Sequence, residues 1–185
     1  MDFFILQSGL DMMLNKTSQT VLVGLLAMSA SSATAQPSKV APNPAGSLIA
    51  RLVGHWEMRG VVRGRPAVYD AVAQWTLARR YVELHMRDRG AASPYEARVF
   101  IVSDTAAGRV LVHWLDNTGA AFSVPAGVGV VSGDTLRFEF AYSDGPFRDT
   151  FIYRRRANEW SMVLESGDGR GGWRPFATYV ARLKS

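Results

Sequence analysis

The side chains best suited to acid–base or metal chemistry near neutral pH are three histidines, at positions 55, 85 and 113. His85 alternates with Glu83 and Arg87, so a carboxylate, an imidazole and a guanidinium would share one face of an extended strand. Such a row could act in proton transfer. The plainer interpretation is a solvated outer face, because the residues between them are apolar and suit the inner face better.

His113 lies in a run that is apolar on both faces. It is therefore either a buried ligand to a metal or haem, or a core histidine with its hydrogen bonds satisfied. His55, between Gly54 and Trp56, either caps a pocket or lies at the surface in a turn. No two histidines have the close spacing of a metal site, such as His-x-His on one strand, so we expect no metal.

Asp149 differs from the other aspartates, most of which fall in turn sequences. It alternates with Phe147, Phe151 and Tyr153, and this spacing would turn it toward the same inner face. A buried carboxylate without a partner is costly, so an arginine such as Arg174 is a candidate partner. Asp149 is therefore a candidate pocket residue.

Composition excludes several classes of protein. The chain has no cysteine, which rules out disulfides, zinc–thiolate sites and cysteine nucleophiles. Its formal net charge is +5, but the arginines are spread along the sequence apart from Arg154 to Arg156, so we expect no nucleic-acid partner. The loop Gly167 to Gly172 lacks the Lys-Ser/Thr ending of a phosphate-binding loop. No nucleophile-elbow motif is present.

The first 35 residues have the pattern of a secretory signal peptide: Lys16, the apolar run Val21 to Ala30, then Ala33-Thr34-Ala35. The apolar run is about half of the roughly 20 residues that span a bilayer. An uncleaved anchor is the alternative, and Met13 is a second possible start. Residues 36–46, rich in proline and small residues, read as a linker. The folded domain is then 47–185, and the protein is periplasmic or secreted.

These candidate residues would be positioned by an all-β domain. Runs of six to eleven residues alternate with Gly, Asp, Asn and Pro turn sequences, after a short helical lead-in or plug at Ser47 to Val53. We predict about ten antiparallel strands in an up-and-down barrel, because closure removes exposed edges. The predicted strands are Trp56–Val62, Ala67–Leu77, Tyr81–Asp88, Tyr95–Ser103, Arg109–Leu115, Ala121–Val130, Thr135–Tyr142, Phe147–Arg155, Glu159–Ser166 and Trp173–Leu183.

Alternation also predicts which side chains face inward. In the last strand Phe176, Thr178 and Val180 share one face. A barrel of eight or more strands can leave room for one small ligand. The predicted lining is Trp56, Tyr69, Phe138, Phe140, Trp160 and Phe176, with His113 and Asp149 as polar contacts.

Short motifs resemble those of lipocalin-like (calycin) barrels: Gly54-x-Trp56, the turn Ser103 to Gly108, and the segment Trp114 to Gly119. They look like an uncharacterised secreted bacterial branch, distantly similar to nitrobindins and fatty-acid-binding proteins, over roughly Leu48 to Leu183. The resemblance implies a central pocket for a small apolar molecule. Nitrobindins hold haem iron with a histidine near the C-terminal strands, and residues 159–185 contain none.

The leading hypothesis is a non-catalytic barrel that binds a small hydrophobic molecule, with no membrane span and with its oligomeric state left open. Three alternatives stay open. The first is an isomerase- or cyclase-type enzyme of lipocalin fold, with Asp149 or His113 in an acid–base pair. The second is a haem-binding barrel with His113 as ligand. The third is a structural envelope domain with a solid core and a basic outer face.

The leader generates the first prediction. When the whole chain is expressed in a bacterium with a periplasm, we expect cleavage between Ala35 and Gln36, because the Ala-Thr-Ala exit suits signal peptidase. The intact mass of the exported protein should correspond to a chain that begins at Gln36. A membrane-retained product that still contains Val21 to Ala30 would instead support the anchor.

Overall fold

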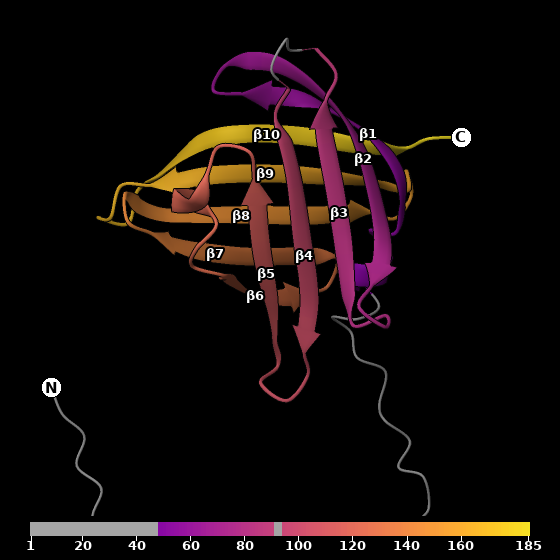
Figure 1. The fold of residues 1–185 in the computed structure, drawn as a ribbon, viewed down its shortest axis with the longest axis horizontal. Coiled ribbons are helices and arrows are strands. Elements are labelled where there is room, and N and C mark those ends of the chain that lie inside the picture. The colour runs from indigo at the N-terminus through magenta and orange to yellow at the C-terminus, as the bar shows by residue number, and fades with distance from the viewer. Residues whose placement is uncertain (1–47, 91–93) are drawn as a thin grey trace, which may run out of the picture. The chain divides into compact units, whose positions relative to one another are not determined.

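The structure is a computed structural model, and it describes residues 48–90 and 94–185. Within them ten strands form a closed antiparallel barrel (Figure 1). Each strand pairs with the next along the chain, and β1 pairs with β10 to close the ring. The strands are β1 Gly54–Val62, β2 Arg65–Thr76, β3 Tyr81–Asp88, β4 Glu96–Asp104, β5 Arg109–Asp116, β6 Gly127–Ser132, β7 Thr135–Tyr142, β8 Gly145–Arg154, β9 Glu159–Gly167 and β10 Trp173–Leu183.

The predicted fold class is therefore confirmed, including the short helical lead-in, which is a helical turn at residues 48–50. Most strand bounds differ from the predicted ones by no more than two residues. The predicted signal peptide 1–35 and linker 36–46 lie outside the described residues. No helix in 48–90 or 94–185 has the length and apolar character needed to span a membrane.

One predicted strand, Ala121–Val130, is wrong in its first half. Residues Ala120–Phe122 form the 3-10 helix η1, and β6 begins only at Gly127. Pro125 has no backbone N–H to donate to a ladder, and Gly119 takes a positive φ of 119° just before η1. As a result only three residues of β6 pair with β5, from Val110↔Gly129 to Val112↔Gly127.

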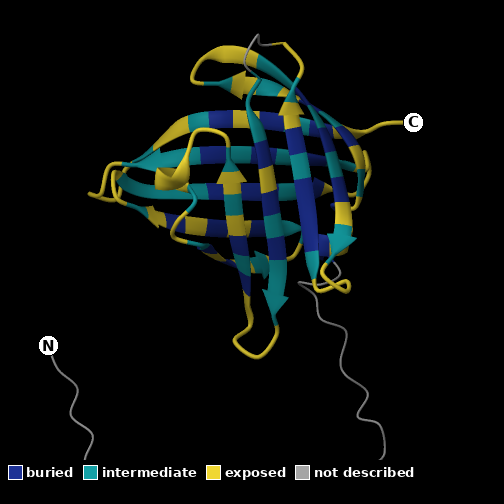
Figure 2. Ribbon diagram, viewed as in Figure 1, coloured by how far each residue is buried: buried dark blue, intermediate teal, exposed yellow. Residues whose placement is uncertain are grey.

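Alternation between apolar and charged residues decides which face of each strand is buried. In β7, Leu136, Phe138 and Phe140 are at most 2% exposed, whereas the intervening Arg137 and Glu139 are exposed. The same banding of buried and exposed positions runs along most of the strands (Figure 2). Each of these strands thus points a row of apolar side chains into the barrel interior.

The last strand departs from the predicted alternation. A bulge between Pro175 and Ala177 shifts the register against β9, so that the inward positions after it are Ala177, Tyr179 and Ala181. Thr178 is exposed, so the prediction that it shares the inward face with Phe176 is wrong. A bulge places one extra residue in a strand and reverses the alternation beyond it. Phe176 precedes the reversal and still faces the interior.

The N-terminal helical turn closes one end of the barrel. Leu48, Ile49 and Leu52 are at most 5% exposed and belong to the hydrophobic core. The indole Nε1 of Trp56 donates to the Leu52 carbonyl at 2.6 Å, and that of Trp160 donates to the Arg51 carbonyl at 3.2 Å. We call this the closed end. The turns β1–β2, β7–β8 and β9–β10, together with η1, lie at the opposite, open end.

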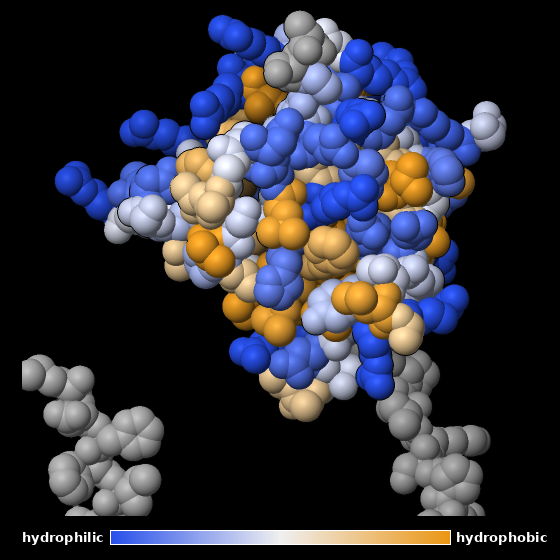
Figure 3. Space-filling view, viewed as in Figure 1, coloured by the Kyte–Doolittle hydropathy of each residue, from blue (hydrophilic) through white to orange (hydrophobic). Residues whose placement is uncertain are grey.

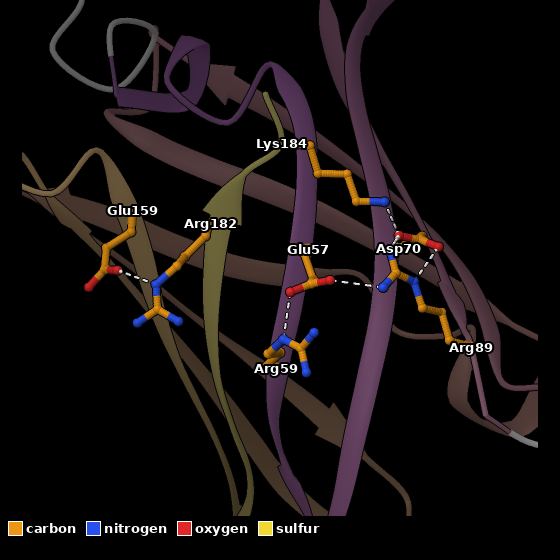
Figure 4. Close-up of polar contacts among 7 residues, drawn as sticks. All are labelled: Glu57, Arg59, Asp70, Arg89, Glu159, Arg182 and Lys184. Carbon is orange, nitrogen blue, oxygen red and sulfur yellow. Dashed lines mark hydrogen bonds and ion pairs between the residues drawn. The ribbon is translucent and has the colours of Figure 1, made fainter.

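The outer face carries ion pairs between neighbouring strands. Beside the seam between β1 and β10, Arg89 binds Asp70 at 2.5 Å and Glu57 at 2.8 Å, and Lys184 also binds Asp70 (Figure 4). On the face that carries β3 to β5, hydrophobic side chains are bordered by hydrophilic ones (Figure 3). The charged outer surface thus links strands that are distant in sequence.

The ion pairs of Asp70 generate a prediction. Hydrogen bonds from Arg89 and Lys184 hold the pKa of Asp70 below its ordinary value. Its contribution to stability is therefore present above that ordinary value, about 3.9, and is lost as the pH falls through the lowered pKa. At neutral pH and low salt, Asp70→Asn should lower Tm by about 1–3 °C, because exposed pairs are weak.

Thermal melts at low and high salt check this. The difference should shrink at high salt and in strong acid. Asp144→Asn is the control, because its exposed carboxylate makes no ion pair with any described residue. An equal loss in the control would contradict the assignment.

Candidate functional site

The interior of the barrel is not filled throughout, and a cavity of about 560 Å³ lies toward the open end. Small-molecule sites commonly have volumes of roughly 300–1,000 Å³. Inward positions from most of the strands contribute to the lining, and so do the turns of the open end. The lining consists of Met58, Val62, Arg63, Tyr69, Leu84, Met86, Tyr95, Trp114, Asp116, Thr118, Phe122, Phe140, Tyr142, Asp144, Gly145, Pro146, Phe147, Asp149, Phe151, Met162, Leu164, Gly167, Phe176 and Tyr179.

Aromatic rings and methionines make up much of this lining. Tyr69 packs edge-on against both Tyr95 and Tyr179, with ring centroids 6.0 and 5.5 Å apart. Phe140 and Tyr142 stack at 5.2 Å with an angle of 4° between their planes. Aromatic pairs in these geometries hold one another in place beyond the burial of their area. The cavity therefore has firm apolar walls.

The tyrosine hydroxyls add polar points to these walls. Tyr95 donates to Asp116 Oδ2 at 2.9 Å and accepts a hydrogen bond from the indole of Trp114, also at 2.9 Å. Burial is the main cause that raises the pKa of Tyr95, Tyr142 and Tyr179 above the ordinary value. These hydroxyls are therefore neutral hydrogen-bonding groups at physiological pH.

Asp149 is the one carboxylate placed deep in the wall of this cavity. It lies on β8 between Phe138 of β7 and Leu164 of β9 and is 1% exposed. Its Oδ1 atom is buried and has no hydrogen-bond partner among the described residues. Loss of hydration raises the pKa of Asp149 well above its ordinary value. Burial thus favours the neutral form of this side chain.

The open end has a covering of its own. Phe122 of η1 lies edge-on to Tyr142 at 5.7 Å, and the Arg63 guanidinium lies 4.8 Å from the centre of the Phe176 ring. Because β6 is short, it pairs only with Val110 to Val112 of β5. The helix η1 contacts β5 where a longer β6 would have extended the sheet. The rim is therefore partly aromatic and partly polar.

The structure brings together half of the residues proposed from the sequence. Tyr69, Phe140, Asp149 and Phe176 all line the cavity. Trp56, Phe138 and Trp160 are at most 3% exposed but do not line it. The two tryptophans pack against the helical turn instead, where their N–H groups find carbonyls. Alternation located the buried face but carried no information on height along the barrel.

His113 is exposed on the outer face of β5, opposite Phe100 of β4, and does not reach the cavity. Its inward neighbours Val112 and Trp114 take the interior positions. The other two histidines also miss the cavity: His55 is exposed, and His85 contacts Glu96 on the outer face at 2.6 Å. A haem held through histidine therefore does not fit this cavity.

Several lining residues were not singled out from the sequence. Alternation alone did not indicate Tyr179, because the bulge in β10 reverses which residues face inward. Tyr95 and Trp114 lie near turns, and the place of those turns at the rim depends on the tertiary fold. Arg174, the suggested partner of Asp149, is exposed and does not line the cavity. In the described part of the chain, no cluster of three or more His, Asp or Glu side chains could hold a metal ion.

No protein-family model matches this chain, and no curated protein matches it. Among solved structures it is similar to the crystal structure of Rv2717c from M. tuberculosis, with a TM-score of 0.56 and 17% sequence identity. The match covers 77% of this chain and 98% of that one. At this identity the likeness shows a shared barrel fold and nothing finer.

Asp149 generates a stability prediction. Because its folded pKa lies above its unfolded pKa, Asp149 destabilises the fold least in acid, and its penalty grows as the pH rises toward the folded pKa. Asp149→Leu removes this penalty and should stabilise the empty protein at neutral pH by about 1–3 kcal/mol. Denaturant titrations should show the gain shrink as the pH falls toward about 4, because the ionisation penalty is lost there and only the cost of the unpaired polar group remains.

Asp149→Asn is the comparison variant. It removes the ionisable group but keeps a polar one in the same place, so its gain should be smaller than that of Leu. If Asp149→Leu were less stable than the wild type at neutral pH, a stabilising partner for the carboxylate would have to exist.

Proposed function

We propose that the barrel binds a small hydrophobic molecule in its cavity, and that it does so in the periplasm or outside the cell after loss of its leader. The observation that carries the proposal is the cavity itself, about 560 Å³ with a largely aromatic and aliphatic lining. An apolar molecule gains free energy by leaving water for such a site. The membership of lipocalin-like barrels suggested by Gly54-x-Trp56 is part of the same proposal.

The arrangement favours binding over a solid structural core. The closed end is packed with Leu48, Ile49, Leu52 and the two tryptophans, whereas the open half keeps free volume. Rigid aromatic pairs such as Tyr69–Tyr179 support a preformed site, which lowers the entropy lost on binding. An enzyme of this fold would need a second acid–base group facing Asp149; Tyr142 and Tyr179, which share the lining with it, have pKa values that burial raises above the ordinary value.

Native mass spectrometry of the exported protein tests the proposal. We expect the mature chain to carry a co-purified apolar adduct that solvent extraction removes. Leu164→Trp should reduce adduct occupancy at least about tenfold, because the indole would occupy cavity volume needed by the ligand. Val163→Trp is the matched control, since the neighbouring residue of β9 points to the outer side and is absent from the lining.

An adduct that persists equally in both variants would place the ligand elsewhere and contradict the proposal. A protein without adduct that also fails to bind added hydrophobic dyes such as anilinonaphthalene sulfonate would contradict it as well. Circular dichroism of both variants checks that the barrel still forms.

A further inference from the structure

A purely hydrophobic ligand leaves one feature of the cavity without a purpose. Asp149 is 1% exposed, lines the cavity, and has an oxygen with no hydrogen-bond partner among the described residues. An unpaired polar group in such a place costs about 1–3 kcal/mol. An isosteric leucine would remove that cost and extend the apolar wall. The presence of this carboxyl group therefore indicates that the bound molecule has a polar atom.

The charged groups around the cavity indicate the sign of the charge on that atom. Its lining contains three carboxyl groups, on Asp116, Asp144 and Asp149, and one cationic side chain, Arg63. Arg63 already lies over the face of Phe176 at the rim. This acidic bias stands in a chain whose formal net charge is +5. The interior thus favours a cation where the exterior as a whole would repel one.

The aromatic lining fits the same partner. The faces of aromatic rings carry negative partial charge and attract ammonium groups within about 6 Å of the ring centre. Tyr142 and Tyr179 line the same cavity as Asp149; burial, with a smaller contribution from Asp149, raises the pKa of both hydroxyls. A cation bound to Asp149 would therefore share the cavity with tyrosine rings as well as with one carboxylate.

We propose that the ligand is a hydrophobic amine, bound with its ammonium N–H donating to Asp149 and its apolar body against the aromatic and methionine side chains of the cavity. This inference rests on the proposed function and specifies its ligand class. A charge-assisted hydrogen bond in a water-poor site is roughly twice as strong as a neutral one. The ammonium also neutralises a carboxylate that has no other partner there.

Binding of an ammonium group should be linked to release of a proton. In the empty barrel, loss of hydration raises the pKa of Asp149 and so favours the neutral acid; a bound ammonium would favour the carboxylate and displace its proton. The other groups that face the cavity are Tyr69 of β2, Tyr142 of β7 and Tyr179 of β10, all with raised pKa values, and Tyr95, Asp116, Asp144 and Arg63 toward the open end. The raised pKa values keep the tyrosines neutral, so Asp149 should dominate the pH dependence.

The test compares three probes with the same chain and different head groups: octylamine, octanol and octanoate. Isothermal titration calorimetry at neutral pH should show octylamine to bind about tenfold or more tightly than octanol, and octanoate to bind most weakly. Repeating the octylamine titration in buffers of different ionisation enthalpy should reveal a proton released on binding. The affinity for octylamine should rise with pH until Asp149 is ionised in the empty protein.

Asp149→Asn should abolish the preference for octylamine over octanol and the proton release, while octanol binding changes little. Asp104→Asn is the control, because that half-buried carboxylate ends β4 at the closed end, is paired with Arg109 of β5 and does not line the cavity. Its octylamine preference should equal that of the wild type. The wild-type proton release keeps the test valid even if Asp149→Asn folds poorly.

Tighter binding of octanol or octanoate would overturn the amine inference and leave the hydrophobic-ligand function standing. An octylamine preference that survives in Asp149→Asn would overturn the role of Asp149. If none of the three probes binds and no adduct co-purifies, both the inference and the proposed function fail together.

Discussion

Closure of the sheet is the constraint on which the rest of the structure depends. Seven residues of β1, from Trp56 to Val62, pair with β10 from Leu183 back to Ala177, and this joins strands that lie more than a hundred residues apart in the chain. Without that pairing both strands would be open edges, with unpaired backbone groups and an exposed apolar face. With it, the inward stripe of every strand faces a shared interior. The ion pairs of Asp70 with Arg89 and Lys184 lie beside the same seam.

A ring of this size encloses more space than its own side chains fill, so the distribution of bulk along the barrel decides what the interior can do. The helical turn fills the closed end, where the indoles of Trp56 and Trp160 hold it by hydrogen bonds to the carbonyls of Leu52 and Arg51. Toward the open end the same inward stripes leave a cavity. One part of the interior therefore supplies stability, and the other retains free volume at some expense of packing.

Asp149 shows the conflict between these two roles. Its neighbours along the strand, Phe147 and Phe151, are apolar, and the ladder places Phe138 and Leu164 on either side of it. A carboxyl group in this setting weakens the empty fold, because burial opposes its ionisation and no described group compensates it. Groups that lower stability in a cavity are commonly groups that meet a ligand. Glu83 differs from Asp149, because this largely buried carboxylate is paired with Arg98.

The sequence by itself determined the fold class and the buried face of most strands, because the period-two alternation and the turn residues are local properties that each segment carries alone. It also placed Asp149 on the inner face, by its spacing from Phe147, Phe151 and Tyr153. Tertiary structure alone decided the height of each side chain along the barrel, which separates Tyr69 and Phe140 in the cavity from Trp56 and Trp160 at the closed end. It decided the reversal after the β10 bulge and the outward side of His113, where both faces of the strand are apolar. Those outcomes depend on register and shear between distant strands, which no short stretch of sequence encodes.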